Sequence, residues 1–415
     1  MTDAVPQRES LRIGALVARA CFLACSWCWG IGMYLPVFLT RDFGWPGWVV
    51  FIVPNTIGAA AVGMLFLRGG SSRATESSHP AAFRWFSIIT ILFHAYFLAL
   101  MLGVVASDFG QDPELGSVGA LLMVALTIPF AALGRRGWHI GSIFCFVASC
   151  ACVVGMLLTS PPGALSLPAA SGAFPLADLA ATSPVIVMGF LLCPVLDLTF
   201  HRTRREEPGR TGTTAFILGL GVLFPALMIF TLLYSGGIAK GVTSLYMYGH
   251  MLGQAGFTIA AHLRELFARG FFIACDEAEW RDPDRRATRR ARDAGAILIV
   301  LFAVLVVGML VWGQPDLHPG YTARRLVYDL FMSFYGLVFP AYVWIVMIPR
   351  RSSAGRPRHA AWAVATLLAA PFFWFGAIQQ QHLWLPIGVA IPLLTPWVLG
   401  LRGSRKTLPT GVGAP

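Results

Sequence analysis

The sequence is poor in charged residues and has no polar stretch long enough to form a soluble domain. Only 12% of its 415 residues are charged, whereas about 25% are charged in an ordinary soluble domain. The longest polar stretch, residues 269–293, is too short to bury a core of its own. With 56% hydrophobic residues and a mean hydropathy of +0.68, the composition predicts an all-α polytopic membrane protein. We expect a single transmembrane domain over residues 1–415.

Several sequence signatures are also missing. The chain contains no Walker A string, no HExxH, no nucleophile elbow and no Rossmann fingerprint, so ATP-driven transport by this chain alone is not expected. Residues 67–85 lack the Gly–Asp–Arg–Gly–Arg pattern of the major facilitator layout. We also expect no cleavable signal peptide, because the first apolar run is too long and no small-residue cleavage site follows it.

The eight cysteines show no pairing pattern, and we expect free thiols. Cys21, Cys25 and Cys28 recur on one helical face. Three thiols could hold Cu(I) or zinc, but no His-rich or Met-rich segment accompanies them. The favoured interpretation is small residues that pack a helix seam. We therefore predict no metal site and no cofactor.

Twelve apolar segments approach the roughly 20 residues that a helix needs to cross a bilayer. We predict twelve transmembrane helices, which cover residues 14–40, 47–67, 85–106, 116–134, 138–159, 183–201, 213–235, 246–268, 294–313, 322–348, 360–378 and 383–401.

The net charge of +11 is distributed unevenly along the chain. If the N-terminus lies in the cytoplasm, 27 of the 31 Lys and Arg residues fall into cytoplasmic segments and four fall into outer ones. This bias is the positive-inside rule, and it fits membrane orientation rather than nucleic-acid binding. We predict a bacterial inner-membrane protein with both termini in the cytoplasm and a cytosolic loop at residues 275–293.

The first and sixth segments contain residues that disfavour a continuous helix. Gly30, Gly32 and Pro36 interrupt the first segment, and Gly189 and Pro194 interrupt the sixth. Glycine and proline are poor helix formers, and a break at membrane depth is tolerated only where neighbours satisfy the freed backbone groups. Because these segments are five apart, they have opposite orientation. Matched interruptions in two inverted halves indicate a transporter site.

This layout, with a short first outer loop and two extra C-terminal segments, resembles the leucine-transporter type of fold of amino-acid permeases and sodium–solute symporters. The resemblance implies five-plus-five inverted repeats, residues 1–160 and 183–348, followed by two helices in residues 360–401. It also implies that the two broken segments face each other at the centre of the bundle. The residues expected to face a substrate are Ser26, Trp27, Gly30, Gly32, Asn55, Gly189 and Cys193.

Four polar residues within apolar segments are candidates for ion or proton coupling. Asp197 either reaches the cytosolic headgroups, has a structural role or carries an ion, proton or substrate function. His94 is either structural or a proton relay. The resemblance implies that the eighth segment packs against the first, where Gln254 or Thr258 could help to bind a cation. Neighbouring hydroxyls are missing there, so coupling to Na⁺ and coupling to H⁺ both stay open.

The sequence favours a secondary transporter that moves a small solute by alternating access, a symporter if it is ion-coupled. Its partners would be the lipid bilayer and a small-molecule substrate, with no nucleic acid. One alternative is an intramembrane acyl or glycosyl transferase that acts on lipid-linked substrates, and another is a sensory or assembly protein without transport. An enzyme should place several polar groups near one membrane face, whereas here single polar groups are spread over mid-depth.

Overall fold

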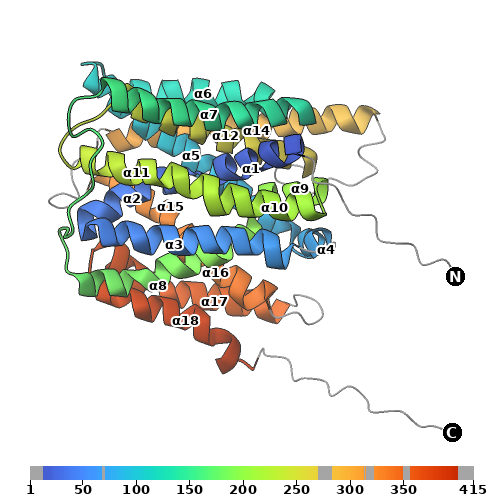
Figure 1. The fold of residues 1–415 in the computed structure, drawn as a ribbon. Coiled ribbons are helices and arrows are strands. Elements are labelled where there is room, and N and C mark those ends of the chain that lie inside the picture. The colour runs from blue at the N-terminus through green and yellow to red at the C-terminus, as the bar shows by residue number, and fades with distance from the viewer. Residues whose placement is uncertain are drawn as a thin grey trace, which may run out of the picture.

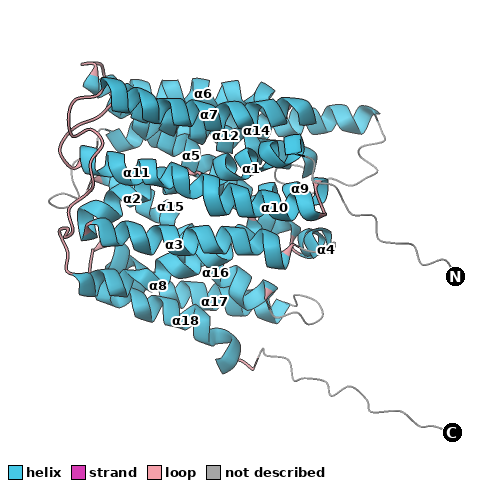
Figure 2. Ribbon diagram, viewed as in Figure 1, coloured by secondary structure: helices cyan, strands magenta, loops and turns pink. Residues whose placement is uncertain are grey.

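The computed structural model describes residues 13–67, 71–269, 283–312, 314, 322–348 and 356–400. Within these ranges the chain is helical, with irregular connections and no strand (Figure 2). An all-helical fold is expected at membrane depth, because a helix satisfies its own backbone hydrogen bonds where no water is present.

The first half of the chain forms helices that follow the predicted segments closely. Their bounds are α1 (Ile13–Trp27), α2 (Gly30–Phe43), α3 (Trp45–Ala61) with a π-helical end (Val62–Phe66), α4 (Ser71–Ser78), α5 (Pro80–Asp108), α6 (Leu115–Ala131) and α7 (Arg135–Thr159).

The second half begins after an irregular connection at residues 160–175. Its elements are α8 (Leu176–Leu192), a 3₁₀ turn (Cys193–Leu196), α9 (Leu198–Glu206), α10 (Arg210–Leu218), α11 (Phe224–Ile238), α12 (Leu245–Arg269), α14 (Pro283–Trp312), α15 (Ala323–Ser333), α16 (Phe339–Tyr342), α17 (Arg356–Phe373) and α18 (Leu385–Val398). π-helical turns link α10 to α11, α15 to α16 and α16 to residue 347, and a further π turn extends α17 to Ile378.

The structure describes an integral membrane protein but does not confirm the count of twelve spans. Among the described residues, seven helices are long and apolar enough to cross a bilayer, and the bent pair of α1 and α2 gives up to eight. Helices α6 and α18 are apolar but shorter. Two predicted boundaries were wrong. The sixth segment begins at residue 176 rather than 183, and residues 283–293, expected in a loop, form the start of α14. Residues 275–282 of that loop lie outside the described residues.

The long helices run nearly parallel through the bundle (Figure 1). Helix α5 lies at the centre, where most of its apolar residues are buried, whereas α7 lies at the periphery. On α7, Ile140 and Phe144 are 70% and 71% exposed, as expected for side chains that face lipid. Helix α1 packs against α7 and α10, α2 packs against α11, and α3 packs against α8. This packing holds the two broken segments in the interior.

Candidate functional site

The first predicted break is present at Cys28 and Trp29, between α1 and α2. The two helices are bent by 53° relative to each other. The Trp29 Nε1–H donates to the Ser26 carbonyl at 2.6 Å, which satisfies a backbone acceptor that the break would otherwise leave free. Gly30 begins α2 where space is limited, since a Cβ atom there would lie 2.9 Å from the ring of Phe93. A larger residue at this turn would have to displace the ring of Phe93.

His94, on α5, holds the start of α2 in place. Its Nδ1–H donates to the Thr90 carbonyl at 2.7 Å, and its Nε2 accepts from the Gly30 backbone N–H at 3.0 Å. Both nitrogens are thus engaged by a neutral imidazole. Of the two roles left open for His94, this geometry supports the structural one.

The second predicted break is present where α8 ends. A 3₁₀ turn at Cys193–Leu196 is followed by Asp197 in an extended conformation. The Asp197 side chain caps α9, because its Oδ1 accepts from the Thr199 backbone N–H at 2.7 Å. Asp197 is fully buried, so the interpretation that its side chain reaches the headgroups was wrong. Its Oδ2 has no hydrogen-bond partner among the described residues.

The two breaks contact each other, as the sequence predicted. The Thr199 hydroxyl donates to the Ser26 hydroxyl at 3.4 Å. The rings of Trp27 and Phe200 lie 5.1 Å apart between centroids, well within one helix diameter.

A cavity of about 160 Å³ lies beside these breaks. Five of the seven residues expected to face a substrate line it, namely Trp27, Gly32, Asn55, Gly189 and Cys193. The Trp27 Nε1–H donates to Asn55 Oδ1 at 2.6 Å. The remaining walls are largely apolar or aromatic, and they include Trp29 and Tyr335. A mostly apolar cavity with a few convergent polar groups is typical of a small-molecule site.

The other predicted residues do not line the cavity. Ser26 and Gly30 are buried in the first break, and Asp197 and His94 have the roles described above. Gln254 and Thr258 are buried on α12. The Gln254 amide donates to the Ser149 hydroxyl at 2.7 Å.

Three charged residues, Asp42, Arg325 and Asp329, line the cavity. They lie toward one end of the bundle, which we call the cavity end. Arg325 lies 3.5 Å from a carboxylate oxygen of Asp42 and 2.9 Å from one of Asp329. Its guanidinium also lies 3.9 Å from the centroid of the Phe38 ring. Arg325 and Asp329 are four residues apart and therefore share a helical face. The partner Asp42, which is distant in sequence, was not predicted.

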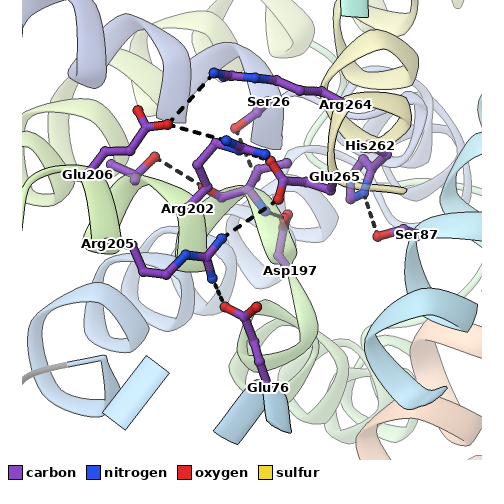
Figure 3. A network of polar contacts seen from close by, with 12 residues as sticks. Ser26, Glu76, Ser87, Asp197, Arg202, Arg205, Glu206, His262, Arg264 and Glu265 are labelled. Atoms are coloured by element: carbon purple, nitrogen blue, oxygen red, sulfur yellow. Dashed lines mark hydrogen bonds and ion pairs between the residues drawn. The ribbon is translucent and has the colours of Figure 1, made fainter. Parts of the chain in front are cut away.

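A cluster of ion pairs surrounds α9 (Figure 3), and α9 lies at the opposite end of the bundle from α2 (Figure 1). We define the α9 cluster as Arg19, Glu76, Arg202, Arg205, Glu206, Arg264 and Glu265. Arg202 pairs with Glu265, Arg205 pairs with Glu76, and Arg19 pairs with Glu206. Arg19 and Glu265 are each only 1% exposed. The protein therefore encloses the Arg19 side chain although it lies near the end of the bundle.

Sequence reasoning missed this cluster because its members come from α1, α4, α9 and α12. The one local signal was the four-residue spacing of Arg202 and Glu206, which do form an ion pair at 3.3 Å. Trp29 was also not assigned to the site. Its ring lies 5.4 Å from Tyr335 and 5.8 Å from His262 between centroids, so it contacts both a residue of the cavity wall and a buried histidine of α12.

No protein-family model and no curated protein sequence matches the chain. Solved structures do resemble it. A Na⁺-coupled sialic acid symporter in a substrate-bound outward-open state is 13% identical, with a TM-score of 0.54 over 95% of this chain and 90% of the symporter. A manganese transporter from Eremococcus coleocola is 11% identical, with a TM-score of 0.49 over 97% of each chain.

The likeness to the symporter shows the fold. The chain has the leucine-transporter type of fold that its broken first and sixth segments predicted. A fold by itself does not assign a substrate or a coupling ion.

Proposed function

We propose that this protein is a secondary transporter that moves a small solute across the membrane by alternating access. The observation that carries the proposal is the cavity at the junction of two broken helices, where five predicted site residues meet. Broken helices at the bundle centre expose backbone polar groups to a bound solute while the rest of each helix stays intact. An enzyme is not favoured, because the structural neighbours are transporters.

The proposed substrate is small and has an apolar part. A cavity of about 160 Å³ is close to an engineered cavity of about 150 Å³ that accommodates benzene. Trp27, Trp29 and Tyr335 supply flat aromatic walls, and Asn55 supplies an amide for orientation. These groups fit a compact solute with one or two polar groups better than they fit a sugar, which needs many hydrogen-bond partners.

The two ends of the bundle support the alternating-access part of the proposal. Cavity-lining residues extend from the first break to the cavity end, whereas the α9 cluster closes the opposite end with ion pairs from four helices. Ion pairs of this kind have two discrete states: the charges are either paired, or separated and hydrated. They can therefore close this end of the bundle in one conformation and open it in another.

The coupling ion and the orientation are also part of the proposal. Asp197 is the favoured coupling residue, since it is buried in the sixth break with one carboxylate oxygen unpartnered within the described residues. Gln254 and Thr258 remain candidates on α12, and either H⁺ or Na⁺ would serve. The distribution of Lys and Arg supports an orientation with both termini in the cytoplasm, and we propose a bacterial inner membrane as the location.

The test begins with a thermal-shift screen of small amphipathic solutes against the purified full chain, followed by uptake in proteoliposomes. Asn55→Ala removes the amide at the cavity wall and should abolish both the thermal shift and uptake. Thr56→Val changes the next residue of α3, which does not line the cavity, and should retain both. Equal uptake by Asn55→Ala and the wild type would contradict the assignment of the cavity as the substrate site.

A further inference from the structure

Helix α12 carries a row of polar side chains on its buried surface. His250, Gln254, Thr258 and His262 follow one another at intervals of four residues, and each is at most 1% exposed. Residues four apart are neighbours on a helix surface, so the four side chains form a continuous band. At 1.5 Å per residue the band is about 18 Å long, more than half the thickness of a bilayer core.

Every member of this row has a polar atom without a hydrogen-bond partner in the described part of the chain. These atoms are both ring nitrogens of His250, Oε1 of Gln254, Oγ1 of Thr258 and Nε2 of His262. Burying a polar atom without a partner costs about 1–3 kcal/mol, and native proteins avoid this cost at nearly all sites. Four such residues in succession indicate a site that is built to bind something polar.

The row passes the break in the first segment. Next to Gln254 lie the Cys25 thiol of α1, at 3.5 Å, and the Ser149 hydroxyl of α7. His262 contacts the Ser87 hydroxyl of α5 at 3.1 Å, and its ring lies 5.8 Å from that of Trp29 between centroids. One turn beyond the row, Glu265 belongs to the α9 cluster. Figure 3 shows His262 and Ser87 next to this cluster.

Few charged or titratable groups face the row. His94 from α5 and Glu265 from α12 itself face His262. His250 faces the Tyr234 ring of α11 at 6.5 Å and the Phe230 ring at 5.1 Å between centroids. The row thus has imidazoles at both ends and two neutral polar groups between them. The carboxylate of Glu265 lies near the His262 end of the row.

We propose that the α12 row binds water and carries protons past the break in the first segment to the α9 cluster. An imidazole accepts a proton at one nitrogen and releases one from the same or the other nitrogen, and a hydroxyl both donates and accepts. At His262 a proton taken up at Nε2 leaves again from Nε2, or from Nδ1 through the Ser87 hydroxyl. Only N–H and O–H bonds form and break. Na⁺ is the weaker candidate, because hard cations prefer several oxygen ligands and the row offers only Gln254 and Thr258.

The first experiment measures whether water reaches the row, and it needs no substrate. Deuterium exchange at the imidazole Cε1, followed by mass spectrometry of the full chain in nanodiscs, reports solvent access to each histidine. His94 is the matched control, since it is equally buried but has both nitrogens bonded to protein. His250 and His262 should exchange on the order of tenfold faster than His94, because local hydration rather than rare opening exposes them. Protection equal to that of His94 would overturn the proposal.

The second experiment measures proton movement in proteoliposomes that contain a pH-sensitive dye, under a membrane potential set by potassium and valinomycin. Thr258→Val removes one hydroxyl from the row without changing side-chain shape and should reduce proton entry to the level of protein-free liposomes. Thr366→Val makes the same change on α17, where the hydroxyl also lacks a partner among the described residues, and should behave as the wild type. Equal proton entry in all three proteins would overturn the proposal, and so would entry that requires Na⁺.

The role of this row in coupling rests on the proposed transport function, but its hydration does not. If His250 and His262 exchange rapidly and no solute is transported, the proposed function fails and the hydrated row stands. If a solute is transported and both histidines are protected from exchange, the proposed function stands, and the proposal that the α12 row is hydrated and carries protons fails.

Discussion

At the scale of single residues, Asp197 combines two roles that can be separated. One carboxylate oxygen caps α9, and the other has no partner within the described chain. Asparagine caps a helix as well as aspartate does but cannot bind a proton. The capping role and the proton-binding role of Asp197 can therefore be tested separately with two substitutions.

We predict that Asp197→Asn keeps the thermal stability of the protein close to wild type and abolishes ion-driven accumulation of a transported solute. Asp197→Ala should in addition lower the stability by about 1 kcal/mol, because the cap of α9 is lost. Thermal unfolding of the purified variants and uptake against a gradient measure the two effects. Accumulation by Asp197→Asn at the wild-type level would show that the carboxylate does not carry coupling.

His94 is the second residue whose roles can be separated. We predict that His94→Ala destabilises the protein by about 1–3 kcal/mol, because the Gly30 N–H is left buried without an acceptor. His94→Gln, whose side-chain oxygen can accept that bond, should be milder and should retain coupling. If His94→Gln abolished coupling without loss of stability, the proton-relay interpretation would replace the structural one.

At the scale of elements, the sequence predicted the breaks but not how tightly they pack. A Cβ atom at Gly189 would lie 2.8 Å from the Tyr335 carbonyl oxygen, and one at Gly32 would lie 3.5 Å from the Met228 sulfur. The first neighbour is backbone, and the second is a flexible side chain. Both glycines line the cavity, so they form a matched pair.

We predict that Gly189→Ala destabilises the protein by about 1–3 kcal/mol through overpacking, whereas Gly32→Ala has little effect. The midpoint of thermal unfolding in detergent measures both. A similar midpoint for the two variants would mean that α8 can move away from Tyr335 at no cost.

Features that depend on local interactions could be predicted from the sequence, whereas contacts between residues far apart in the chain could not. Gly30 and Pro194 weaken a helix through local backbone chemistry, so the breaks were visible in the sequence. The Arg19–Glu206 pair joins residues 187 positions apart, and nothing local indicates it. The start of α14 at Pro283 was missed because a charged helix can extend beyond the apolar segment, and proline is well tolerated in a first helical turn.

At the scale of the whole molecule, the orientation in the membrane rests on the distribution of Lys and Arg, and it stays a prediction, as does the division into repeats at residues 1–160 and 183–348. We predict that single cysteines placed in residues 109–114 and in residues 275–282 react with impermeant reagents from opposite sides of the membrane. Reaction of both from the same side would contradict the predicted topology.

The most direct test of alternating access compares the two ends of the bundle in one experiment, in a background without native cysteines. Ser333→Cys reports on the cavity wall, and Thr203→Cys reports on buried α9. Glu265→Gln removes a buried carboxylate that pairs with Arg202 and Arg205, which weakens the closure because the arginines of the α9 cluster lose one of the negative charges that balance them. We predict that Glu265→Gln speeds alkylation of the cysteine at position 203 and slows it at position 333. Faster alkylation at both positions, or no change at position 333, would contradict it.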